Sequence, residues 1–140
     1  MRKGKTINEI EIGDEASFSK TIFEADIVLF GAITGDFNPM HFNEEYAKTT
    51  PFKTRIAHGG IAGSLIAPVL GMMLPGLGTI ALETKTRYLA PVKPGDTITA
   101  TGKVVSKDIG RNTVVMELTW KNQKDKLVMS GEATVMPPRA

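Results

Sequence analysis

The sequence predicts an α+β fold in which a curved antiparallel sheet wraps around one long apolar helix. Two observations predict it. Residues 61–74 form a nearly uninterrupted apolar stretch, and four later segments alternate apolar and polar side chains with a period of two. A helix that is apolar on nearly all sides must be covered by other structure, and strands with one apolar face can cover it. The 140 residues fit one domain, so we expect residues 1–140 to fold as a single unit.

Alternating side chains predict strands over residues 80–88, 97–105, 113–121 and 127–135. In the third of these segments the apolar positions are Val114, Met116, Leu118 and Trp120. We expect each strand to bury its apolar face. The connections between the segments are short and rich in turn-forming residues, which favours antiparallel pairing. Residues 15–22 alternate more weakly and are expected to form an additional first strand.

Three helices are expected before these four strands. Residues 24–34 carry an apolar stripe with helical spacing, which we expect to be buried, and Gly35 ends that helix. Asn43 caps a short second helix. Residues 60–74 form the long apolar helix, which Pro68 is expected to kink. The apolar stripe of the first helix consists of Ala25, Val28, Leu29, Ala32 and Ile33.

The composition argues against several classes of protein. Cysteine is absent, which rules out disulfides, thiolate metal ligands and a cysteine nucleophile. That absence is compatible with a reducing cytosol, and we expect a cytoplasmic protein. The net charge of +2 is too balanced to indicate a nucleic-acid partner. The apolar stretch at 61–74 is too short to span a membrane, and the basic N-terminus lacks the apolar segment of a secretion signal.

Residues 34–41 read Thr-Gly-Asp-Phe-Asn-Pro-Met-His and contain the candidate catalytic pair. Asp36 and His41 stand five residues apart in what we expect to be a tight, non-helical loop. Either residue alone is more often a cap or a structural side chain. A carboxylate and an imidazole held in one bend can share a water molecule and move its protons. Asn38 lies in the same loop and is expected to support the pair.

Residues 57–64 read Ala-His-Gly-Gly-Ile-Ala-Gly-Ser and begin the long helix. The first N–H groups of a helix lack partners inside it, so the N–H of Gly59 can hold an oxygen that gains negative charge. The same glycines also fit a plain turn and helix start. Ser64 can bond back to a backbone carbonyl, but we expect it to support the site by orienting Asp36 or a water molecule. His58 is expected to be structural.

Two further patterns do not predict cofactor or metal sites. Residues 76–81 match the G-x-G-x-x-A fingerprint of dinucleotide-binding proteins. That fingerprint requires a strand before it and a helix after it, whereas here the order is reversed. Two histidines without paired carboxylates give no recognisable metal ligand set. We therefore expect neither a cofactor nor a metal ion.

The two motifs resemble the signature of a known family. The pattern Thr34-Gly35-Asp36-x-Asn38-Pro39-Met40-His41, followed by Ile56-x-His58-Gly59, resembles that of MaoC-like dehydratases. Within them it most resembles the small, single-domain (R)-specific enoyl-CoA hydratases. The resemblance covers nearly the whole chain, including the Pro-Gly-Asp turn at 94–96. Met40 departs slightly, since leucine, isoleucine or valine is more usual there, but it keeps the position apolar.

The resemblance implies a hot-dog fold, assembly as a homodimer or a dimer of dimers, and an acyl-CoA thioester as substrate. The implied reaction is reversible addition of water to a trans-2-enoyl-CoA, giving the (R)-3-hydroxyacyl-CoA. Asp36 and His41 would activate the water and handle the proton that reaches C2, and because both lie in one loop the addition should be syn. The N–H of Gly59 would hold the thioester oxygen. Candidate partners for the coenzyme A phosphates are Arg55, Lys85, Arg87 and Lys93.

Three other functions stay open at this point. The first is a dehydratase that acts on substrates carried by acyl carrier protein, which a basic surface patch would favour. The second is a non-catalytic acyl-CoA-binding hot-dog protein, although a binder has no need for both Asp36 and His41. The third is a thioesterase of the same fold, which would direct water at the carbonyl carbon rather than at C3.

Overall fold

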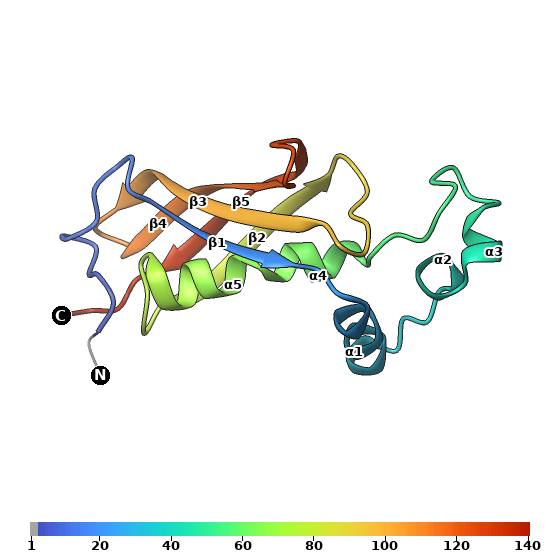
Figure 1. Cartoon of the computed structure of the whole chain (residues 1–140). Helices are drawn as coiled ribbons and strands as arrows, with labels where there is room; N and C mark the ends of the chain where they lie inside the picture. The colour runs from blue at the N-terminus through green and yellow to red at the C-terminus, as the bar shows by residue number, and fades with distance from the viewer. Residues whose placement is uncertain (1–2) are drawn as a thin grey trace.

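The computed structural model describes residues 3–140 and contains a five-stranded sheet and a series of short helices (Figure 1). In chain order the elements are β1 (Glu15–Thr21), α1 (Glu24–Thr34), α2 (Pro39–Phe42), α3 (Glu44–Ala47), α4 (Gly59–Ser64), α5 (Ile66–Pro68), the π-helical turn η1 (Val69–Met73), β2 (Ile80–Tyr88), β3 (Thr97–Asp108), β4 (Thr113–Lys121) and β5 (Leu127–Met136). All five predicted strands are confirmed. The α+β class with a curved antiparallel sheet is confirmed as well.

The strands are ordered β1-β3-β4-β5-β2, and every neighbouring pair is antiparallel. The apolar side of β4 is fully buried, as its alternation predicts, and Trp120 lies in register with Ala100 of β3 and Met129 of β5. This face of the sheet packs on the segment formed by α4, α5 and η1, which runs beneath the strands (Figure 1). The core therefore lies between one sheet and one helical segment.

The long helix predicted over residues 60–74 is interrupted. The α-helical geometry of α4 ends at Ser64, and the N–H of Leu65 turns back to the carbonyl of Ala62 at 3.1 Å. Pro68 explains the interruption, because it has no N–H to offer the carbonyl four residues earlier, at Ser64. The segment then ends in the π-helical turn η1, where the N–H of Leu74 reaches the carbonyl of Val69 at 2.8 Å. The expected disturbance by Pro68 is confirmed, and the predicted long helix is present as three consecutive helical pieces, α4, α5 and η1.

The predicted burial of β2 is wrong within the protomer. Every residue of β2 is exposed, including Ile80 at 57% and Leu82 at 50%. Strand β2 lies at one edge of the sheet and pairs only with β5, and the described protomer leaves the side chains on both of its faces accessible. The period-two pattern thus identifies the strand correctly but not its neighbours.

The apolar stripe of α1 is also exposed, contrary to the prediction. Ile33, for example, is 73% exposed, and α1 instead buries Ile27 and Gly31. Gly31 permits a close approach, because a Cβ added there would lie 2.8 Å from the ring of Phe42. Helix α1 therefore packs on the α2 segment through its small residue, and its stripe stays free for another contact.

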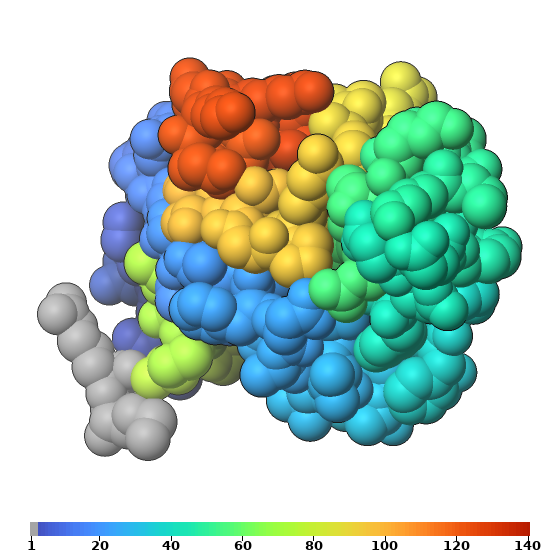
Figure 2. All heavy atoms as spheres, turned by 45° about the vertical axis from the view of Figure 1, so that its right-hand side comes forward, coloured from blue at the N-terminus to red at the C-terminus, as the bar shows by residue number. Residues whose placement is uncertain are grey.

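Residues 24–55 form a lobe at one end of the sheet, built from α1, α2 and α3 and their connections (Figures 1 and 2). In the space-filling view this lobe lies beside the connection that leads into β3. None of the helices in residues 3–140 is long and apolar enough to cross a membrane. The lobe meets the start of α4, and the predicted site residues lie at that junction.

Candidate active site

The chain between α1 and His41 is shaped by two consecutive side-chain caps. Gly35 ends α1 in the left-handed region, with φ of 78°. The Asp36 carboxylate then accepts the N–H of Asn38 at 3.1 Å, and the Asn38 side chain accepts the N–H of Met40 at 3.1 Å. Asn38 is thus the N-cap of α2, followed by the proline that favours the first helical position. His41 lies in this short helix, so the prediction of a wholly non-helical loop is wrong.

His41 is buried, with 6% of its surface exposed, and its orientation is fixed by the backbone. Its Nδ1 lies 2.7 Å from the carbonyl oxygen of Ile56. A carbonyl can only accept, so Nδ1 must carry a proton to make this hydrogen bond. In the neutral imidazole, Nε2 is then unprotonated and can accept a proton. The backbone contact therefore sets the tautomer that a proton acceptor needs.

His58 lies between the two predicted catalytic residues. It is 2% exposed, and its ring stacks on that of His41 with centroids 3.9 Å apart. Its Nε2–H donates to the backbone carbonyl of Asp36 at 2.9 Å, and its Nδ1 is buried without a hydrogen-bond partner in the described chain. The sequence predicts a structural role for His58, and its contacts with Asp36 and His41 place that role inside the site itself.

Asp36, His41 and His58 converge. Each offers one polar side-chain atom, and these atoms all lie within 4.8 Å of one another. The two residues predicted as a pair are therefore brought together. These three are also the residues that could hold a metal ion, but one nitrogen of each imidazole already bonds a backbone carbonyl. The absence of a metal ion stays a prediction from the sequence.

Gly59 follows His58 directly and is the first residue of α4. Its N–H therefore has no partner inside the helix. The ring of Tyr88 covers it so closely that an added Cβ would lie 2.4 Å from that ring. Beside it lies an apolar cavity of about 390 Å³, which Met40 and Gly59 both help to line. The cavity thus reaches Gly59 and Ile56, the residue whose carbonyl bonds His41, whereas Asp36, His41 and His58 themselves are not among its lining residues.

The other predicted residues lie as follows. The hydroxyl of Ser64 donates to the carbonyl of Ile61 at 2.6 Å, so it bonds back to the helix rather than to Asp36. The guanidinium of Arg55 is occupied by the carboxylates of Glu24 and Glu44, so the prediction that Arg55 binds the coenzyme A phosphates is not supported by its contacts. Sequence reasoning missed the carbonyl of Ile56, for which no side-chain signal exists.

The fold and the site together define a hot-dog enzyme of the hydro-lyase class. Residues 6–125 match the family described as MaoC like domain, and the chain belongs to that family. It is 46% identical over 130 residues to the (R)-specific enoyl-CoA hydratase of Rhodospirillum rubrum, covering 93% of this chain and 90% of the relative.

Solved structures agree with this assignment. The unliganded R-hydratase of Pseudomonas aeruginosa is 41% identical with a TM-score of 0.90, covering 98% of this chain and 88% of that one. The (R)-hydratase of Aeromonas caviae is 34% identical with a TM-score of 0.88, covering 92% of this chain and 98% of that one. The resemblance to the MaoC-like family stated from the motifs is confirmed.

Proposed function

We propose that this protein is an (R)-specific enoyl-CoA hydratase, which reversibly adds water to a trans-2-enoyl-CoA and gives the (R)-3-hydroxyacyl-CoA. One observation carries the proposal: the Asp36 carboxylate converges with a buried imidazole whose Nε2 is the free acceptor. The names of the similar R-hydratases support it. The identity between the chains and the conserved overall shape make the same chemistry the most economical assignment.

The reaction follows from the geometry of the pair. A water molecule held between Asp36 and His41 loses a proton to one of them as its oxygen bonds to C3 of the substrate. The electrons of the double bond move toward the thioester, whose oxygen gains negative charge and accepts a hydrogen bond from the N–H of Gly59. C2 then receives a proton from the same pair. Oxygen and proton arrive from one side, so the addition is syn.

The apolar cavity accommodates the apolar part of the thioester substrate. Its lining is dominated by aliphatic, aromatic and methionine side chains, which suits a hydrocarbon ligand. Lys85 and Arg87 on β2, and Lys93 beyond it, are exposed and remain candidates for the coenzyme A phosphates. We also infer that residues 1–140 act as one MaoC-like domain and that the protein is cytoplasmic, which the absence of cysteine supports.

A panel of trans-2-enoyl-CoA thioesters of different chain length tests this assignment. Loss of the enoyl absorbance reports hydration, and free thiol reports hydrolysis. We expect absorbance to fall without thiol release. Release of thiol would instead indicate a thioesterase. Activity confined to acyl-carrier-protein thioesters would indicate the carrier-protein dehydratase, and no signal at all would indicate a binding protein.

We infer that the protein assembles as a homodimer, or as a dimer of dimers, through the edge strand β2. An unpaired edge with exposed apolar side chains invites pairing, and two-fold closure is the usual solution. Strand β2 fits this description, and the exposed stripe of α1 adds further apolar surface. Because Tyr88 of β2 covers Gly59, each active site would lie close to the interface.

Light scattering at micromolar concentration should return at least twice the chain mass of 15.1 kDa. Leu82→Lys should shift the distribution toward the monomer, because it places a charge on the apolar edge. Ile109→Lys is the matched control, since Ile109 is also an exposed apolar residue, at 63% against 50% for Leu82, but lies in a turn outside β2. A mass of 15.1 kDa for the unsubstituted protein would contradict the assembly.

A further inference from the structure

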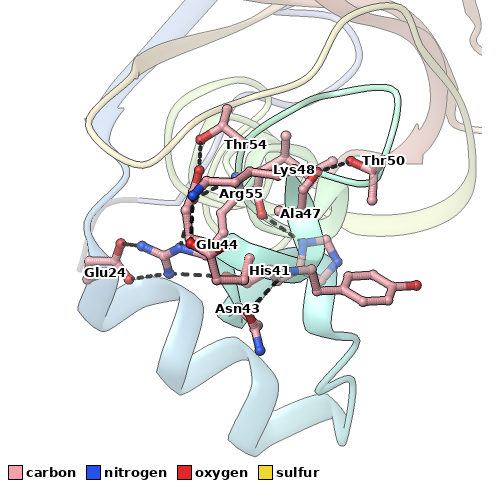
Figure 3. A network of polar contacts seen from close by, with 12 residues as sticks. Glu24, His41, Asn43, Glu44, Ala47, Lys48, Thr50, Thr54 and Arg55 are labelled. Carbon is pink, nitrogen blue, oxygen red and sulfur yellow. Dashed lines mark hydrogen bonds and ion pairs between the residues drawn. The ribbon is translucent and has the colours of Figure 1, made fainter.

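Arg55 joins three segments of the lobe that carries the site (Figure 3). Its guanidinium forms two hydrogen bonds to Glu24 in the first turn of α1 and an ion pair with Glu44 of α3 at 3.6 Å. The same group donates to the backbone carbonyl of His41 at 3.3 Å. Only 24% of the Arg55 side chain is exposed. Arg55 thus contacts α1, α2 and α3 at once.

The backbone on either side of Arg55 fixes the imidazole of His41. The N–H of Arg55 donates to Glu44 at 3.1 Å, and the next residue, Ile56, supplies the carbonyl that accepts Nδ1–H of His41. The N–H of Ile56 in turn reaches the carbonyl of Met40 at 3.4 Å. Two backbone segments, 40–41 and 55–56, therefore hold one another. Arg55 ties them at both ends, through its side chain and through its own N–H.

Arg55 and Glu44 both keep their charges at neutral pH, because each pKa is shifted further from neutrality. The hydrogen bonds that Arg55 donates to Glu24 raise the pKa of Arg55, with the charges of Glu24 and Glu44 acting in the same direction. The pKa of Glu44 is lowered, mainly by the hydroxyl of Thr54 and then by the backbone N–H of Arg55. A guanidinium presents five donors in a planar fork, so it can serve two carboxylates and a carbonyl together. A lysine ammonium cannot reproduce this geometry.

We propose that Arg55 is a positioning residue for His41. By holding α2 against residues 55–56 as a clamp, Arg55 fixes the tautomer and the direction of the His41 imidazole. The proposal rests on the proposed function for its kinetic consequence, but the clamp itself is a property of the free protein. Arg55 is not a catalytic residue, since its contacts go to backbone and carboxylates. Its role is to position His41 and not to bind the coenzyme A phosphates.

The test compares Arg55→Ala and Arg55→Lys with Arg111→Ala, the same change at an arginine that is 85% exposed in a turn. Imidazole ¹H–¹⁵N spectra of the free proteins report the tautomer of His41, with its signals assigned by their loss in His41→Asn. Steady-state kinetics with a trans-2-enoyl-CoA give kcat and KM separately. The spectra require no turnover, so a failure of the proposed function and a failure of the clamp are distinguishable.

We expect Arg55→Ala to lower kcat by roughly 10- to 100-fold, because a catalytic group displaced by about 1 Å can lose that much. KM should change less than threefold, the Nδ1–H signal of His41 should shift or broaden, and Arg55→Lys should recover only part of kcat. Arg111→Ala should match the unsubstituted protein. If Arg55→Ala does not fold, Glu24→Gln removes one carboxylate and should produce the same spectral and kinetic changes to a smaller degree.

Three results would overturn the proposal. A rise in KM with kcat and the imidazole spectrum unchanged would identify Arg55 as a substrate-binding residue. A lower melting temperature with an unchanged His41 signal in folded Arg55→Ala would reduce its role to general stability. If Arg55→Ala does not fold, unchanged spectra and kinetics in Glu24→Gln would contradict the clamp in the same way.

Discussion

Asp36→Asn and His41→Asn should each lower turnover of a trans-2-enoyl-CoA by at least about 100-fold. Asp36→Asn keeps an oxygen that can accept the N–H of Asn38 but removes the carboxylate charge. His41→Asn keeps a donor for the carbonyl of Ile56 but removes Nε2, and it suits this buried position better than a truncation to alanine. Both proteins should remain folded by circular dichroism.

The double variant distinguishes a shared water from two independent contributions. Because both groups act on one water molecule, removing the second should cost far less than removing the first, and the combined loss should fall well short of the product. Asp125→Asn is the matched control, since Asp125 is an exposed carboxylate in the turn before β5. A folded Asp36→Asn that hydrates at nearly the unsubstituted rate would remove Asp36 from the mechanism.

Gly59→Val should lower kcat/KM by roughly 10²–10³-fold while the fold is retained. The added side chain displaces the ring of Tyr88, which would lie 2.4 Å from its Cβ, and obstructs the approach of the thioester oxygen to the N–H. Steady-state kinetics measure the loss, and circular dichroism checks the fold.

Gly71→Val is the matched control for this prediction. A Cβ at Gly71 meets no other group within 4 Å, so the same chemical change in the same helical segment should leave the kinetics nearly unchanged. Kinetics of Gly59→Val that equal those of the unsubstituted protein would remove Gly59 from the oxyanion role.

The strands and their order of appearance follow from local pattern, which is why the sequence predicts them well. Period-two alternation depends only on which side of a strand faces the core, and β3 and β4 keep that alternation over their buried positions. The connections from β3 to β4 and from β4 to β5 are short, so these two pairings are antiparallel by chain connectivity, whereas β2 pairs with β5 rather than with β3, the next strand in the chain. Fold class could thus be predicted before any tertiary contact was known.

Burial depends on neighbours that a local pattern does not identify. The apolar residues of β2 and the stripe of α1 have the spacing of buried faces, yet both are exposed in the protomer. The same surfaces are those that we propose to pack in the assembled protein. The position of the interruption at Leu65 is easier to predict than burial. Pro68 has no N–H, so the carbonyl four residues before it, at Ser64, lacks its hydrogen-bond donor within the helix.

The site residues likewise fall into those that the sequence predicts and those that it does not. Side chains that carry the chemistry, Asp36 and His41, could be named from their spacing in one loop, and the structure brings them together. The groups that orient them are a carbonyl at Ile56 and a stacked ring at His58. A backbone carbonyl has no sequence signature. The sequence marks Arg55 only as a positive charge, because the acidic partners that define its role are 31 and 11 residues away in the chain.

Hydration of a trans-2-enoyl-CoA in D₂O, followed by determination of the configuration at C2 and C3 of the product, tests the central claim most directly. Because Asp36 and His41 act from one side, the account predicts the (R) alcohol at C3, with deuterium delivered to C2 on the same face as the new oxygen. An (S) alcohol, deuterium on the opposite face, or release of free coenzyme A without hydration would contradict it.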